Sequence, residues 1–95
     1  MNYLESLQDA VQKAHGCEAN HIESVPIKEV FRGQTIWDGT VEVFALAGHP
    51  KATRCYAWGY HADDKSKDFR IVTVLGSLPV DSPLAAVRVS ITGEM

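Results

Sequence analysis

The stretch of sequence that decides the fold is QTIWDGTVEVFALAGHPKATRCYAWGY, residues 34–60, in which two alternating apolar runs flank one compact polar loop. In the first run, the two-residue period of a strand puts Trp37 and Val43 on one face. The alternation keeps its phase through Asp38 and Gly39, which favours one long strand with a kink or bulge at Gly39. An Asp-Gly pair between apolar runs is also a strong hairpin signal, so a turn at this point is the alternative.

The second run, residues 54–61, sorts its side chains by size. One face is bulky and carries the aromatic residues Tyr56, Trp58 and Tyr60. The other face is small, because its residues include Cys55, Ala57 and Gly59.

Towards the N-terminus, apolar residues repeat at helical spacing over residues 3–15. Asn2 begins a capping box, and Gly16 is placed to end the helix in a left-handed conformation. Residues 22–31 then read as a strand, which Pro26 confines to a sheet edge or a bulge because proline lacks a backbone donor.

Towards the C-terminus, residues 69–75 are β-branched and apolar on both faces, as expected of a central strand. Ser82 and Pro83 are typical of a helix start, and Gly93 would end that helix. Three alternating apolar residues in the same segment also fit a strand: Val87, Val89 and Ile91.

The order of helix, four strands and helix predicts a single α+β domain over residues 1–95. Short connections favour a four-stranded antiparallel meander sheet. We expect an N-terminal and a C-terminal helix packed on one face of this sheet, so that the other face is open to solvent or to a partner.

The identity of the open face is the central question for function. If the helices pack on the small face, then Tyr56, Trp58 and Tyr60 are exposed and available to a partner or ligand. The alternative is that these aromatic residues form the core and the small face is solvated. Trp37 belongs to the same choice, because its register relative to Trp58 is not defined by the sequence.

Charge and composition argue against several classes of partner. The net charge of −3 and the lack of a basic run argue against nucleic acid. The longest apolar run is far shorter than the roughly 20 residues that span a bilayer, and the N-terminus lacks the features of a secretory signal. Cys17 and Cys55 are then expected as free thiols in a cytoplasmic protein.

Candidate catalytic groups are few. Cys55 follows Arg54, and His49 precedes it by six residues, so a cation and a base could activate the thiol. A strand would however point Cys55 away from Arg54, which favours a buried structural cysteine. Asp38 and Glu42 share a strand face and could act as paired carboxylates if that face were enclosed, although charges that alternate with apolar residues more often indicate a solvated face.

Metal and anion sites have weak support. Two clusters hold metal-ligating residue types without the paired spacing of a zinc site: His15, Cys17 and His21, and His61, Asp63 and Asp64. Lys51 and Arg54 flank a turn and could hold an anion, but no glycine-rich phosphate loop accompanies them. We therefore expect no metal and no cofactor.

The middle third of the chain resembles small uncharacterised bacterial proteins of the integron gene-cassette type. The motifs that carry this resemblance are Trp37-Asp38-Gly39, Val41-Glu42-Val43-Phe44, Gly48-His49-Pro50-Lys51 and Cys55-Tyr56-Ala57-Trp58. The resemblance implies a compact bacterial protein and carries over no catalytic residue.

Three hypotheses follow. The first is a non-enzymatic binding or interaction module that uses its aromatic face for self-association, as a dimer, or for a small apolar ligand. Its candidate binding residues are Trp37, Tyr56, Trp58, Tyr60, His49 and Arg54. The second is a small enzyme with a Cys55 or an Asp38 and Glu42 centre in a tryptophan-lined pocket, and the third is an accessory subunit of a larger complex.

Overall fold

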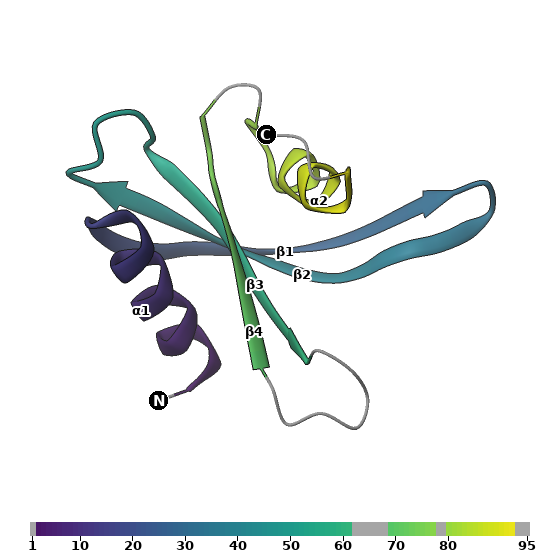
Figure 1. The fold of residues 1–95 in the computed structure, drawn as a ribbon, viewed down its shortest axis with the longest axis horizontal. Helices are drawn as coiled ribbons and strands as arrows, with labels where there is room; N and C mark the ends of the chain where they lie inside the picture. The colour runs from purple at the N-terminus through teal and green to yellow at the C-terminus, as the bar shows by residue number, and fades with distance from the viewer. Residues whose placement is uncertain (1, 62–68, 78–79, 93–95) are drawn as a thin grey trace.

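The protein is a four-stranded antiparallel sheet with one helix before it and one after it (Figure 1). The computed structural model describes residues 2–61, 69–77 and 80–92. The elements in chain order are α1 (Tyr3–His15), β1 (Glu18–Phe31), β2 (Gln34–Ala47), β3 (Arg54–His61), β4 (Phe69–Leu75) and α2 (Pro83–Thr92). Neighbouring strands pair in the order β1-β2-β3-β4, which confirms the α+β class and the meander. Of the two described helices, neither is long and apolar enough to cross a membrane.

Local sequence signals place the ends of α1. The side chain of Asn2 accepts a hydrogen bond from the Glu5 backbone N–H at 2.8 Å and donates one to the Glu5 carboxylate at 3.0 Å. Gly16 adopts φ 63°, and its N–H donates to the carbonyl of Gln12. Both ends of α1 therefore satisfy backbone groups that the helix itself leaves unpaired.

β1 and β2 form one long hairpin closed by a two-residue turn. Arg32 and Gly33 both have positive φ, 52° and 79°, as a type I′ turn requires. Pro26 lies on β1, an edge strand, which confirms the prediction from its missing donor. The strand is longer than the sequence indicated, because residues 18–21 also pair with β2.

The Asp38-Gly39 pair lies inside the continuous strand β2, as favoured over a hairpin. The predicted bulge at Gly39 is wrong, because the register passes through Gly39 without a shift. The alternative of a kink there stays a prediction. The two register shifts lie instead beside Ile22 and between Glu29 and Val30. Gly39 has a different role, since a Cβ there would lie 3.1 Å from the Trp37 ring, so the glycine leaves room for the indole.

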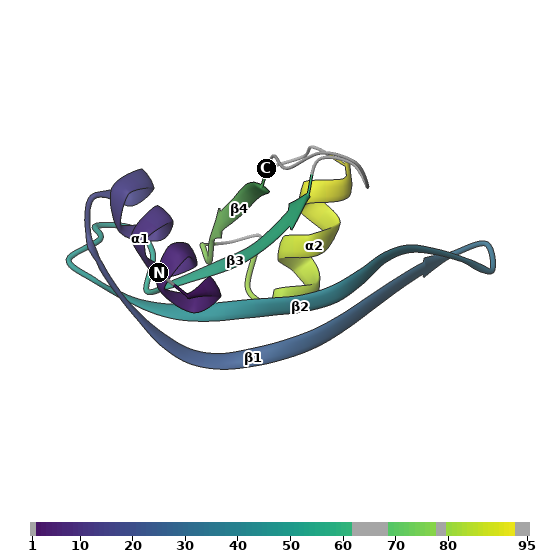
Figure 2. The ribbon, with the colours of Figure 1, turned by 90° about the horizontal axis from the view of Figure 1, so that it is seen from below.

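The two helices lie on opposite faces of the sheet, which corrects the expectation that both pack on one face. Figure 2 shows β3 and β4 passing between α1 and α2. One core cluster joins α1 to the small side chains of β3, and its members include Leu7, Val11, Cys55 and Ala57. The other joins α2 to the bulky side chains of β3, and its members include Tyr56, Trp58, Ala86 and Val87.

The size sorting along β3 explains this arrangement. Successive side chains of a strand point to opposite faces, so the small and the bulky residues necessarily separate. Small side chains allow α1 to approach closely, whereas Tyr56 and Trp58 present a large apolar area that is stable only when covered. Each of the two open-face alternatives is therefore partly correct: α1 covers the small face, and α2 covers part of the aromatic face.

The opposite placement of the helices predicts additive mutational effects. Val11→Ala under α1 and Val87→Ala under α2 should each lower the free energy of unfolding by about 2 kcal/mol, through lost burial and a residual cavity. Because the sheet separates the two sites, we expect the double variant to show the sum within about 0.5 kcal/mol in urea denaturation.

The matched control combines Val87→Ala with Val43→Ala, since both residues belong to the α2 cluster. This pair should depart from additivity because its members share one packed environment. A coupling energy above about 1 kcal/mol between Val11 and Val87 would contradict the separation of the two cores.

Candidate ligand-binding cleft

The candidate site arises where β2 and β3 separate. These strands pair over only four residues each, and the last pair is Glu42 with Ala57. Continuing that register by two residues would place Thr40 opposite Gly59, but the strands no longer pair there. The Gly59 N–H instead donates to the hydroxyl of Tyr3 on α1 at 2.9 Å. A side chain from a helix thus replaces the missing strand partner.

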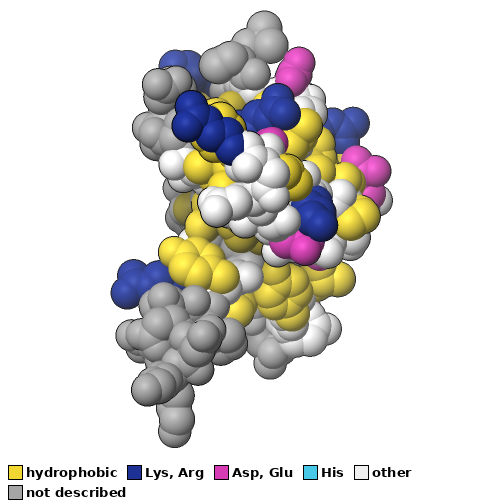
Figure 3. Space-filling model, turned by 90° about the vertical axis from the view of Figure 1, so that its right-hand side faces the viewer, with side chains coloured by type: hydrophobic (Ala, Val, Ile, Leu, Met, Phe, Trp, Pro, Cys, Tyr) yellow, Lys and Arg dark blue, Asp and Glu magenta, His cyan; other side chains and the backbone are white. Residues whose placement is uncertain are grey.

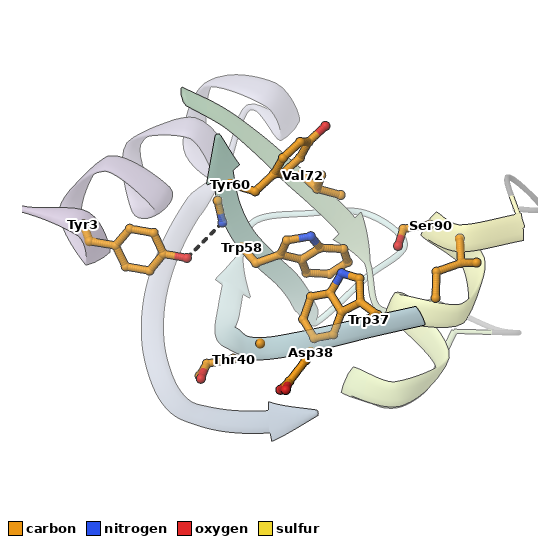
Figure 4. Close-up of a pocket in the computed structure, with 11 residues that line it drawn as sticks. Tyr3, Trp37, Asp38, Thr40, Trp58, Tyr60, Val72 and Ser90 are labelled. Atoms are coloured by element: carbon orange, nitrogen blue, oxygen red, sulfur yellow. Dashed lines mark hydrogen bonds between the residues drawn. The ribbon is translucent and has the colours of Figure 1, made fainter. Parts of the chain in front are cut away.

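The separation opens a cleft of about 490 Å³. The strands β2, β3 and β4 and the helix α2 line the cleft, together with Tyr3 from α1, as Figure 4 shows. The lining residues are Tyr3, Trp37, Asp38, Gly39, Thr40, Trp58, Gly59, Tyr60, Val72, Ser90 and Ile91. A volume of this size falls within the range of small-molecule sites in proteins.

The two tryptophans form the aromatic wall of the cleft. Trp37 and Trp58 meet edge to face, with ring centroids 5.4 Å apart and planes at 75°. Trp58 is 4% exposed and belongs to the α2 core cluster, whereas Trp37 is partly buried against that cluster. The fixed ring of Trp58 therefore supports the more exposed ring of Trp37.

On the α1 side, the lining residue Tyr3 packs against Phe69. Their rings meet edge to face with centroids 6.1 Å apart. The Phe69 ring lies over Gly59, where a Cβ would overlap it. Gly59 is therefore required for close packing, and its neighbours keep the Tyr3 hydroxyl within reach of its N–H.

The structure brings together three of the six predicted binding residues: Trp37, Trp58 and Tyr60 line the cleft. Tyr56 is 3% exposed in the core under α2, and burial raises the pKa of its hydroxyl. This position makes Tyr56 a packing residue in the described structure.

His49 and Arg54 lie away from the cleft, in and next to the connection between β2 and β3. The Nδ1 atom of His49 accepts hydrogen bonds from the backbone N–H groups of Lys51 and Ala52, both at 3.0 Å. The imidazole therefore stabilises the loop to which His49 belongs. The carbonyl of Arg54 accepts a hydrogen bond from Gly76 at 2.7 Å.

Several lining residues were not among the predicted ones. Tyr3, Ser90 and Ile91 belong to the helices, and Val72 belongs to β4. Their sequence neighbourhoods read as ordinary helix and strand patterns, so no local signal marks them. They reach the cleft only because the helices pack against the sheet.

Cys55 does not have the environment of a nucleophile. Its side chain is fully buried in the α1 cluster, and this burial raises the pKa of the thiol to about 12. The thiolate is the reactive form of cysteine, so the group is inert near neutral pH.

Asp38 and Glu42 lie in different environments on β2. Glu42 is 5% exposed, and its carboxylate accepts hydrogen bonds from His21 Nε2 at 2.9 Å and from the hydroxyl of Ser24. The register shift at Ile22 brings His21 and Ser24 to the same carboxylate. Asp38 is exposed and lines the cleft, so the two carboxylates do not form one centre.

The metal-ligating residue types that are close in the sequence do not form a metal site among the described residues. Within residues 2–61, 69–77 and 80–92, no group of three or more such side chains could hold a metal ion. His15 Nε2 lies 3.1 Å from the hydroxyl of Thr73, and burial together with nearby His49 lowers the pKa of His15. Residues 63 and 64 and the side chain of His61 lie outside the described structure.

Comparison with protein-family models, with curated proteins and with solved structures finds no match to this chain. The resemblance to gene-cassette proteins therefore stays a prediction.

The contrast between the two cysteines provides a test of this environment. In the folded protein at pH 8 to 9, a small alkylating reagent should modify partly exposed Cys17 and leave Cys55 unmodified. Cys55 should remain protonated there because its pKa lies near 12. Denaturation in urea should expose both thiols, and mass spectrometry of peptides separates the two sites. Rapid modification of Cys55 in the folded chain would contradict its burial and restore it as a candidate nucleophile.

Proposed function

We propose that this chain is a non-enzymatic binding module whose cleft between β2 and β3 takes a small apolar ligand. The observation that carries the proposal is the position of both tryptophans beside a cleft of about 490 Å³, where two neighbouring strands stop pairing. Aromatic walls supply a large contact area with few rotatable bonds to restrict, which suits a flat apolar ligand.

The non-enzymatic part of the proposal is supported by the described polar groups. The Cys55 thiol is buried and protonated, and the Glu42 carboxylate is occupied by two hydrogen bonds. Neither group reaches the cleft, where a reacting substrate would be. We place the module in the cytoplasm because Cys17 and Cys55 are free thiols.

Indole is a suitable probe of the cleft, because it is flat, apolar and uncharged. We expect saturable binding, followed by NMR shifts of the two tryptophan indole N–H signals. Trp37→Leu should weaken the affinity by about tenfold, since an aromatic pair contributes about 0.5–1.5 kcal/mol beyond its buried area. The matched control is Phe31→Leu, an aromatic residue outside the cleft, which should leave the affinity unchanged.

Circular dichroism of both variants shows whether each one is still folded, so that weaker binding can be assigned to the site and not to unfolding. Equal weakening by the two substitutions would mean that indole binds elsewhere. No shift of either indole N–H signal at millimolar indole would remove the cleft as a ligand site.

Self-association is a second candidate function, because a second apolar surface, which shares Ile91 with the cleft, lies between the end of the β1-β2 hairpin and α2. We define the hairpin patch as the exposed residues Phe31, Ile36 and Ile91. Phe31 is 58% exposed, and a shallow hollow of about 190 Å³ lies beside it. Figure 1 shows the hairpin extending beyond α2, and Figure 3 views the molecule from this side, with hydrophobic side chains among charged ones.

The charges around the hairpin patch favour a second copy of the chain as its partner. Arg88 and Glu29 form an ion pair of 2.7 Å at the hollow, and Arg32 lies over the Phe31 ring. Both signs of charge therefore border one apolar surface. A surface that carries both signs of charge can meet a second copy of itself without a uniform like-charge repulsion, and the two-fold symmetry usual in homodimers brings the same patch of both copies together.

Sedimentation equilibrium tests this candidate directly. The wild-type chain should reach twice its monomer mass at micromolar concentrations, and Phe31→Ser should shift the dissociation constant upwards by at least tenfold, through lost apolar burial. Ile22→Ser is the matched control, because Ile22 is exposed at the other end of β1. A wild-type chain that stays monomeric at millimolar concentration would contradict self-association.

A further inference from the structure

The cleft between β2 and β3 has two chemically different sides. Side chains alternate along β2, so Trp37 lies on the α2 side of the strand and Asp38 on the α1 side. Figure 4 shows this division, with Trp37 and Trp58 on one side of β2 and Asp38 and Thr40 on the other. A ligand that fills the cleft therefore meets the two tryptophan rings on one side, and the oxygen atoms of Asp38 and Thr40 with the Tyr3 side chain on the other.

The part of the lining that the structure describes carries charge of one sign. Among the lining residues that the structure describes, Asp38 is the single charged side chain. Its carboxylate has no hydrogen bond or ion pair with any described residue. Lys28 lies opposite Asp38 on β1 but does not line the cleft. An anionic ligand would meet this carboxylate without a lining cation to offset it.

Both ends of the cleft attract positive charge. The faces of tryptophan and tyrosine rings carry negative potential, which attracts a cation placed near such a face. The carboxylate of Asp38 adds direct attraction at the other end. The hydroxyl of Thr40 offers an acceptor beside it.

We propose that the ligand is an amphiphilic amine, with a flat apolar group against Trp37 and Trp58 and its ammonium group on the Asp38 side. This inference rests on the proposed function of the cleft and adds the charge and the polarity of the ligand.

Three probes with the same indole ring and similar side chains separate the effect of charge from that of shape. Tryptamine is cationic, tryptophol is its neutral counterpart, and indole-3-acetate is anionic. In NMR titrations of the tryptophan indole N–H signals at low salt, we expect tryptamine to bind at least fivefold more tightly than tryptophol. Indole-3-acetate should bind more weakly than either.

Substitution of the carboxylate identifies the source of this preference. Asp38→Asn should reduce the preference for tryptamine over tryptophol to less than twofold, because it removes the negative charge that attracts the ammonium group. Asp81→Asn, at an exposed aspartate outside the cleft, is the matched control and should keep the full preference.

The outcomes separate the two proposals. Equal affinities for tryptamine and tryptophol in the wild-type chain, or a preference that survives Asp38→Asn, would overturn the amine assignment while the cleft remains a binding site. Absence of binding by all three probes and by indole would overturn both proposals.

Discussion

Burial of β3 on both of its faces is the constraint on which the rest of the structure depends. The strand carries small residues on one side and bulky aromatic residues on the other, so each side needs a different cover. α1 approaches the small side closely, and α2 covers Tyr56 and much of Trp58 on the other. Two short helices can stabilise this sheet because each covers the face that its partner leaves open.

The cleft lies where the pairing of β2 with β3 ends, between the two helices. α1 packs on β1, β3 and β4, whereas α2 packs on the β1-β2 hairpin and shares a core cluster with Tyr56 and Trp58 of β3. β2 and β3 stop pairing after Glu42 and Ala57, and the bulky rings of Trp37 and Trp58 lie at the gap. The Gly59 N–H, which has no partner on β2, donates to the Tyr3 hydroxyl instead. The cleft thus forms without leaving that donor unsatisfied.

Glu42 and His49, which the sequence suggested as catalytic candidates, form hydrogen bonds within the fold. Glu42 is nearly buried, and His21 and Ser24 both bind its carboxylate. His49 accepts two backbone N–H groups of its own loop. Among the described residues, every buried side-chain nitrogen or oxygen atom has a hydrogen-bond partner. The cleft differs from these groups, because its aromatic wall is open and its carboxylate, Asp38, is exposed.

The sequence by itself determined the elements and their order, because the relevant signals are local. The caps at Asn2 and Gly16, the Arg32-Gly33 turn and the missing donor of Pro26 each act within a few residues. The two-residue period also separated the small from the aromatic face of β3. Only the tertiary structure decided that α1 and α2 take opposite faces, that β2 and β3 separate after Glu42, and that Tyr3, Val72 and Ile91 join the two tryptophans. These features depend on contacts between residues far apart in the chain, where competing packings differ in buried area and leave no trace in local spacing.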